Sequence, residues 1–171
     1  THIRGTKMTI TAQIIADSIS PEGIRLTTMQ LRYPRWIHAE ELTHRLLSTH
    51  PESIVYEAIP DGLMYDKNLS RNASSSRAMP VLRMIEDLRR DPAMPVYYGS
   101  NMPGMQAGAE LTGFPLAAVK DEWLIAMENA IKSAEFMVER GLHKQIANRI
   151  LEPWAHVNVV VTATDWANFF A

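Results

Sequence analysis

Two stretches near the start of the chain alternate apolar and polar residues in the way that half-buried strands do. Residues 9–18 are rich in isoleucine, and residues 24–31 continue the pattern after the turn sequence Pro21-Glu22-Gly23. We expect these two strands to form a hairpin. Residues 157–162, which contain a run of consecutive valines, predict one more buried strand.

Other segments place apolar residues at three- and four-residue steps, which predicts amphipathic helices. Residues 115–140 give the strongest pattern, and Gly141 is a natural C-terminal cap for that helix. A shorter helix is predicted at residues 80–90, and another at residues 142–151, which Pro153 ends. The longest of these helices is expected to form the backbone of the core.

The remaining segments are less regular. Pro34 is well placed as the first residue of a further helix, and Thr164 can cap a last one. Residues 49–67 are interpreted as a loop with at most one short strand. Residues 70–76 are polar and serine-rich, which suits the lead-in to a helix. Residues 95–108 form a glycine-containing loop, either a plain connector or a place where backbone approaches a ligand.

This mixture of strands and helices predicts a single domain of the α/β or α+β class. Within it we expect a mixed or antiparallel sheet packed by helices, including one long core helix. Residues 1–7 precede Met8 and are predicted to be an N-terminal extension, so the domain is expected to span residues 8–171. The sequence stops inside an expected helix, which leaves open that the domain is truncated at its C-terminus.

The composition is that of an ordinary globular protein. The chain has 171 residues, of which 46% are hydrophobic and 21% charged, and its formal net charge is −2. This balance gives no basic field that would attract nucleic acid. We therefore expect no nucleic-acid partner. We also expect no membrane partner, since no apolar stretch is long enough to span a bilayer.

The chain contains no cysteine. Disulfides, thiolate metal sites and cysteine nucleophiles are therefore excluded, and we predict no metal site. The lack of cysteine also agrees with a reducing cytoplasm.

Side chains that suit a phosphate and the edge of a pyrimidine gather in four places. They offer arginine forks, hydroxyls and amides, and a serine run before a helix presents donors near the positive end of the helix dipole. Each cluster alone has a plainer interpretation, because serine runs are usually solvated turns and His-Arg pairs usually lie on surfaces. The clusters are Thr43-His44-Arg45, residues 70–77, Gly104-Met105-Gln106, and Asn148-Arg149 with Asn168.

In combination these clusters resemble the flavin-dependent thymidylate synthases. His44-Arg45 match the end of an Arg-His-Arg triplet, and residues 70–77 match a Ser-x-Asn-x-x-Ser-x-Arg stretch. The Gly-Met-Gln-Ala segment at residues 104–107 and the sequence of residues 143–153 are similar to a phage-type branch. The resemblance covers residues 25–171 and implies the cytoplasm of a bacterial or phage-infected cell.

The resemblance implies a role for each matched residue. It makes Arg77 and Arg149 the catalytic arginines, which bind the nucleotide and polarise its ring. The implied cofactor-binding residues are His44, Arg45, Asn72 and Asn168. The implied substrate-binding residues are Glu40, Ser74, Ser75, Ser76, Arg77 and Arg149.

The implied reaction is the methylation of dUMP to dTMP. Methylenetetrahydrofolate would supply the carbon, reduced FAD would supply the electrons, and NADPH would reduce the flavin again. The resemblance also implies a homotetramer with sites between subunits, so the clusters need not meet within one chain. The reaction requires no protein nucleophile, which fits the missing cysteine.

Three departures from the family pattern keep other functions open. Thr43 replaces the first arginine of the triplet, Ala73 replaces a frequent glutamate, and residues 49–67 look like an insertion. A changed site that admits water would make 5-hydroxymethyl-dUMP instead of dTMP. The other alternative is a homologue that binds nucleotide or flavin without turnover.

Overall fold

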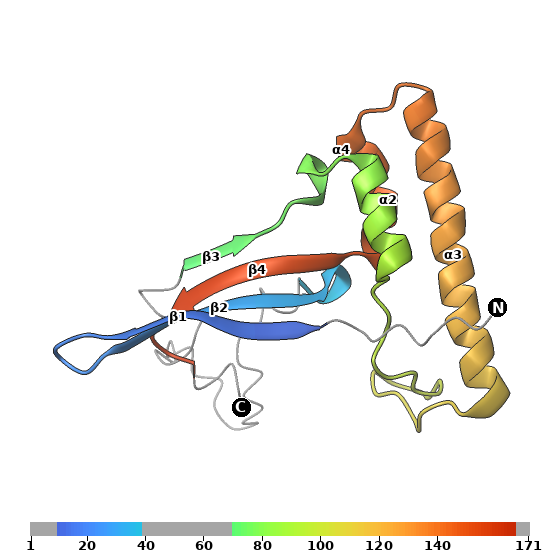
Figure 1. Cartoon of the computed structure of the whole chain (residues 1–171). Helices are drawn as coiled ribbons and strands as arrows, with labels where there is room; N and C mark the ends of the chain where they lie inside the picture. The colour runs from blue at the N-terminus through green and yellow to red at the C-terminus, as the bar shows by residue number, and fades with distance from the viewer. Residues whose placement is uncertain (1–9, 39–69, 167–171) are drawn as a thin grey trace. The chain divides into compact units, whose positions relative to one another are not determined.

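The computed structural model describes residues 10–38 and 70–166 (Figure 1). By their contacts, the described residues form two compact units, and the chain passes between them at residues 74–75 and again at residues 156–157. The sheet unit consists of residues 10–38, 70–74 and 157–166, and the helical unit consists of residues 75–156.

The sheet unit is built on an antiparallel sheet in which the described strands are ordered β1-β2-β4-β3. The strands are β1 (Thr11–Ile19), β2 (Arg25–Pro34), β3 (Ser70–Ala73) and β4 (His156–Ala163). The predicted hairpin is confirmed, because β1 pairs with β2 and Gly23 takes a positive φ of 84° in the turn between them. Glycine adopts this conformation without the clash that a Cβ atom would cause.

Burial in the sheet unit follows the two-residue period of a strand. Along β4, Val157, Val159, Val161 and Ala163 are fully buried, whereas the residues between them are exposed or half-buried. They pack in one cluster with Met29, Leu31 and Tyr33 of β2. One face of the sheet is therefore apolar, as antiparallel sheets with one covered face require.

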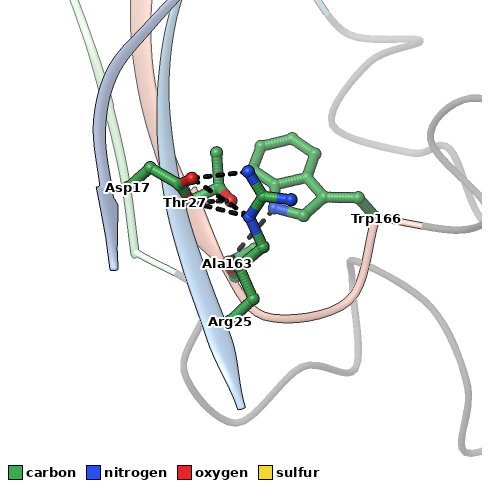
Figure 2. Close-up of polar contacts among 5 residues, drawn as sticks. All are labelled: Asp17, Arg25, Thr27, Ala163 and Trp166. Carbon is green, nitrogen blue, oxygen red and sulfur yellow. Dashed lines mark hydrogen bonds and ion pairs between the residues drawn. The ribbon is translucent and has the colours of Figure 1, made fainter. Parts of the chain in front are cut away.

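The turn end of the hairpin carries a polar network instead of a core (Figure 2). The Asp17 carboxylate accepts hydrogen bonds from Arg25 Nε at 2.9 Å and from the Thr27 hydroxyl at 2.9 Å. Trp166, which follows β4, lies in the same region and donates its indole N–H to the Ala163 carbonyl at 3.1 Å. The hairpin end of the sheet thus holds a neutralised acid–base pair.

One strand of the sheet was not predicted. Residues 70–76 were expected to lead into a helix, but Ser70–Ala73 form the strand β3, which pairs with β4 from Ser70 opposite Thr162 to Ala73 opposite Val159. The strand lies at the edge of the described sheet and its side chains are mostly exposed. Polar residues are therefore tolerated, because backbone pairing with β4 rather than side-chain burial determines their conformation.

The helical unit contains the predicted long helix. Its elements are η3 (Ser76–Ala78), α2 (Val81–Arg90), α3 (Gly113–Glu139), α4 (Lys144–Ala147) and η4 (Asn148–Trp154). Gly141 ends α3 as predicted, since it has a φ of 85° and the next N–H, from Leu142, donates to the Met137 carbonyl at 3.0 Å. Among the described helices, none combines the length and hydropathy needed to cross a membrane.

Three helical segments share the core of this unit. It includes Leu88 of α2, Ile131 of α3, and Leu151 and Trp154 of η4. The Trp154 indole N–H donates to the Trp123 carbonyl at 3.0 Å, and the two rings lie 6.0 Å apart. Packing against α2 and α3 therefore determines where η4 lies.

The helix predicted at residues 142–151 was wrong in form. A single α-helical turn, α4, continues into the 3-10 helix η4, and Pro153 lies inside that helix instead of ending the segment. The buried residues are Asn148, Leu151 and Trp154, three residues apart. A 3-10 helix has three residues per turn, so this spacing aligns them on one face.

The predicted α+β class is confirmed by the described residues, with an antiparallel sheet and one long helix. Pro34 closes β2 and precedes the short 3-10 helix η1 (Arg35–Ile37). Three predicted segments lie outside the described residues: the continuation of the helix after Pro34, the loop at residues 49–67 and the helix after Thr164.

Candidate functional site

The predicted phosphate-binding serines and arginine lie on a turn of the helical unit that η4 supports. Ser76, Arg77 and Ala78 form η3, which precedes α2 in the chain. The Asn148 amide Nδ2 donates to the Ser76 carbonyl at 2.7 Å and to the Met79 carbonyl at 2.9 Å. The Lys144 ammonium donates to the Ala78 carbonyl at 3.0 Å. Two side chains thus satisfy three carbonyl groups of the turn and fix its backbone.

A single carboxylate oxygen joins this turn to Arg149. Glu152 Oε1 accepts the hydroxyl of Ser76 and also accepts a hydrogen bond from Arg149 Nη1 at 2.9 Å. Ser76 is buried, Glu152 is largely covered, and the Arg149 side chain is half exposed. The structure therefore brings Ser76 and Arg149 together, and it neutralises the charge of Arg149 through an acid that we had given no role.

Ser75 and Arg77 differ from Ser76, because both are exposed. Within the part of the chain that the structure describes, neither side chain has a hydrogen-bond or ion-pair partner. The Arg77 guanidinium thus retains all its donors and its full charge. A rigid backbone that presents a free guanidinium and a free hydroxyl is suited to bind an anion.

Ser74 lies in the sheet unit and completes the pairing of β3 with β4. Its hydroxyl accepts the backbone N–H of Asn158 at 3.0 Å, and its own N–H donates to the Asn158 carbonyl at 2.8 Å. On the same edge strand, Asn72 is exposed, so its amide is accessible. The predicted substrate role of Ser74 and cofactor role of Asn72 stay predictions.

The other predicted site residues lie outside the described residues. These are Glu40, His44, Arg45 and Asn168.

The Gly104-Met105-Gln106 cluster lies at the exposed tip of a loop that folds back on itself. Gly99 pairs with Glu110 in an isolated bridge, and the Tyr97 hydroxyl donates to the Gly108 carbonyl at 2.8 Å. A Cβ atom on Gly99 would lie 2.4 Å from the Cβ of Ala107. At Gly99, the backbone therefore lies close to the other arm of the same loop, and glycine is the residue that permits this approach.

Three side chains support the turn: Lys144, Asn148 and Glu152. Sequence reasoning missed Lys144 and Glu152, and it named Asn148 in a cluster without predicting its contact with the turn. The three residues follow one another at four-residue steps, which in an α-helix would place them on one side, although residues 148–154 form a 3-10 helix. That polar stripe was the available signal. The contact with a turn more than sixty residues earlier was not visible, because no local pattern marks it.

The chain matches no protein-family model and no curated protein. It is similar to the solved structure of a UMP/dUMP methylase, PolB from Streptomyces cacaoi, bound with 5-Br UMP, with 13% sequence identity and a TM-score of 0.62. The match covers 92% of this chain and 73% of that one. The same methylase bound with 5-Br dUMP matches at 13% identity with a TM-score of 0.57, over 92% of this chain and 74% of that one. The likeness shows a shared fold.

Proposed function

We propose that the chain is an enzyme that modifies the uracil ring of a pyrimidine nucleoside monophosphate, and that it methylates dUMP to dTMP with FAD, NADPH and methylenetetrahydrofolate. Two independent observations support the substrate class. The motifs of residues 44–45 and 70–77 resemble enzymes that act on dUMP, and the fold is similar to that of a UMP/dUMP methylase. A similar fold alone does not determine a reaction, so the proposal depends on the residues of the site.

The exposed Arg77 guanidinium carries the proposal. It projects from a turn whose carbonyl groups are held by Asn148 and Lys144, and it has no competing acidic partner in the described chain. An arginine fork on a fixed backbone binds a phosphate through two parallel hydrogen bonds. We assign the nucleotide phosphate to Arg77, with the hydroxyl of Ser75 beside it.

Arg149 takes a different role from Arg77. Because Glu152 already accepts a hydrogen bond from Arg149 Nη1, a phosphate at Arg149 would be repelled by the Glu152 carboxylate. The other N–H groups of Arg149 suit neutral acceptors, such as the carbonyl groups of uracil or a sugar oxygen. We therefore propose that Arg149 orients and polarises the nucleotide, and that Glu152 holds it in position.

The residues proposed to hold FAD are His44, Arg45, Asn72 and Asn168. Asn72, the described member, fits this role, because it lies exposed on an edge strand and its amide both donates and accepts hydrogen bonds. Bound FAD would supply the electrons that turn a transferred one-carbon unit into a methyl group. A chain without cysteine has no thiolate to activate the uracil ring, which agrees with this chemistry.

The experiment that tests the proposal is incubation of the purified full chain with FAD, dUMP, NADPH and methylenetetrahydrofolate, followed by the product's mass. We expect a flavin spectrum in the protein and dTMP as the product. If the product is 5-hydroxymethyl-dUMP, the chain catalyses hydroxymethylation, the alternative reaction, instead of methylation. Colourless protein that takes up no FAD and forms no product would contradict the proposed function. A parallel assay with UMP in place of dUMP measures the selectivity for the sugar.

A further inference from the structure

Arg35, which the sequence resemblance leaves without a role, has an unsatisfied donor in the sheet unit. It begins η1 directly after β2, and its Nη2 donates to the Ser74 carbonyl at 2.8 Å. Its Nε is buried and has no hydrogen-bond partner. The side chain as a whole is half-buried, so one end of the guanidinium is anchored while another donor remains unused.

No acidic residue described in the sheet unit lies near Arg35 along the sheet. The described acids of this unit are Asp17, Glu22 and Asp165. Asp17 lies opposite Thr27 and is bound to Arg25, and Glu22 lies in the hairpin turn. Since β2 runs from Arg25 at the hairpin to Pro34, Arg35 is at its other end, about 30 Å away at roughly 3.3 Å per residue.

Asp165 lies at the hairpin end as well. The Thr162 hydroxyl contacts that of Thr28, near the hairpin end of β2, at 2.9 Å, and Asp165 follows three residues later. The acids of the described sheet unit therefore lie toward the hairpin, and none of them is placed at the end that Arg35 occupies.

An arginine in this setting favours the binding of an anion. A buried N–H donor without an acceptor is costly, and the cost is greater when the group is charged. The Nε and terminal nitrogens of arginine form a planar fork that matches two oxygens of a phosphate. The bond from Arg35 to the Ser74 carbonyl fixes the orientation of the fork before any ligand arrives.

We propose that Arg35 is an anion-binding residue whose free donors bind phosphate oxygens of a nucleotide. The identity of the ligand rests on the proposed function, and it has two sources: the monophosphate of dUMP or the pyrophosphate of FAD. The phosphate chemistry is common to both. A residue that only braced the Ser74 carbonyl would show no preference for phosphate.

The test compares Arg35→Gln, Arg35→Lys and Arg25→Gln in the full chain. Arg25 is the matched control, because it lies in the same unit, at the opposite end of β2, but is bound to Asp17. Affinities are measured by calorimetry for inorganic pyrophosphate, for dUMP and deoxyuridine, and for FAD and riboflavin. Thermal unfolding of each variant shows that it is folded.

We expect Arg35→Gln to bind pyrophosphate, and either dUMP or FAD, about tenfold to a hundredfold more weakly than wild type. Deoxyuridine and riboflavin should bind as before, Arg35→Lys should keep part of the affinity, and Arg25→Gln should match wild type. Loss for dUMP identifies the substrate as the source, and loss for FAD identifies the cofactor.

Unchanged affinities in Arg35→Gln would overturn the inference, as would an equal loss for ligands with and without phosphate. A wild-type chain that binds none of the phosphate compounds would overturn it too. The pyrophosphate measurement separates the two proposals, because a chain that binds pyrophosphate through Arg35 but does not turn over dUMP would refute only the proposed reaction.

Discussion

Arg149 and Glu152 are joined by a hydrogen bond of 2.9 Å between Arg149 Nη1 and Glu152 Oε1, and the same oxygen accepts the hydroxyl of Ser76. The carboxylate therefore connects an exposed arginine with a buried serine of the η3 turn. A mutation of Glu152 has two consequences, one on the stability of the turn and one on the charge of Arg149.

We predict that Glu152→Ala lowers the free energy of unfolding by about 1–3 kcal/mol, because the buried Ser76 hydroxyl loses its acceptor. The half-exposed ion pair with Arg149 contributes little, about 0–1 kcal/mol. Urea unfolding measures the change. Glu86→Ala is the control, because Glu86 is exposed on α2 and should cost less than about 0.5 kcal/mol.

A double-mutant cycle with Ser76→Ala isolates the contact between Ser76 and Glu152. If the hydroxyl is responsible, Glu152→Ala should cost less in the Ser76→Ala background than in wild type. Equal costs in both backgrounds would show that the hydrogen bond contributes nothing to stability.

Asn148 is the second support of the turn, and its replacement should be more damaging. Asn148 is fully buried, and Asn148→Ala leaves the carbonyls of Ser76 and Met79 without their donor. We expect a loss of about 2–4 kcal/mol in the free energy of unfolding, as for a pair of broken buried hydrogen bonds. Asn129→Ala, on an exposed position of α3, is the control and should be nearly neutral. Equal effects of the two substitutions would contradict the role given to Asn148.

Arg77→Ala should weaken nucleotide binding and leave the stability almost unchanged, unlike Asn148→Ala. Its side chain has no partner in the described chain, so the unfolding free energy should change by less than about 0.5 kcal/mol. The affinity for dUMP should fall by about 1.5–3 kcal/mol through the lost phosphate contact. Equilibrium titration with dUMP measures this, and Arg83→Ala on the outer face of α2 is the control. A wild-type affinity in Arg77→Ala would mean that the serine–arginine motif has been assigned wrongly.

The acid dependence of the hairpin follows from the environment of Asp17. Hydrogen bonds from Arg25, and then from Thr27, hold the pKa of Asp17 below its ordinary value. The ionised carboxylate is the form that the folded state prefers, so its contribution is present above about pH 4 and is lost as the pH falls through the folded-state pKa. Asp17→Asn should destabilise the chain at pH 7, and the difference from wild type should shrink toward pH 3. A difference that stays constant over this range would show that the charge of Asp17 is not responsible.

Local patterns were sufficient for the hairpin, β4 and α3, because alternation, helical period and Gly141 each act within one element. They failed for β3, whose polar residues become a strand only by pairing with β4. They also failed for η4, where burial of Asn148, Leu151 and Trp154 selects a three-residue period.

Prediction of the site had the same limit. The motifs named Ser76, Arg77 and Arg149, but they did not predict that Ser76 and Arg149 meet through one carboxylate oxygen. The link through Glu152 had no local signal, because it depends on a contact between η3 and η4. The free donor of Arg35 is likewise visible only once β2 and β3 are placed in one sheet.

The surface of the hairpin leads to a prediction about assembly. Every residue of β1 is exposed, including Ile14, Ile15 and Ile19, and β1 is an edge strand of the described sheet. Exposed isoleucines on a sheet edge favour pairing with another chain, and burying one contributes about 1.5–3 kcal/mol. We expect the chain to form the homotetramer that the resemblance implies, and Ile14→Lys to weaken it. Light scattering after size exclusion should show a smaller mass for Ile14→Lys but not for the control Gln13→Lys, and a monomeric wild type would contradict the prediction.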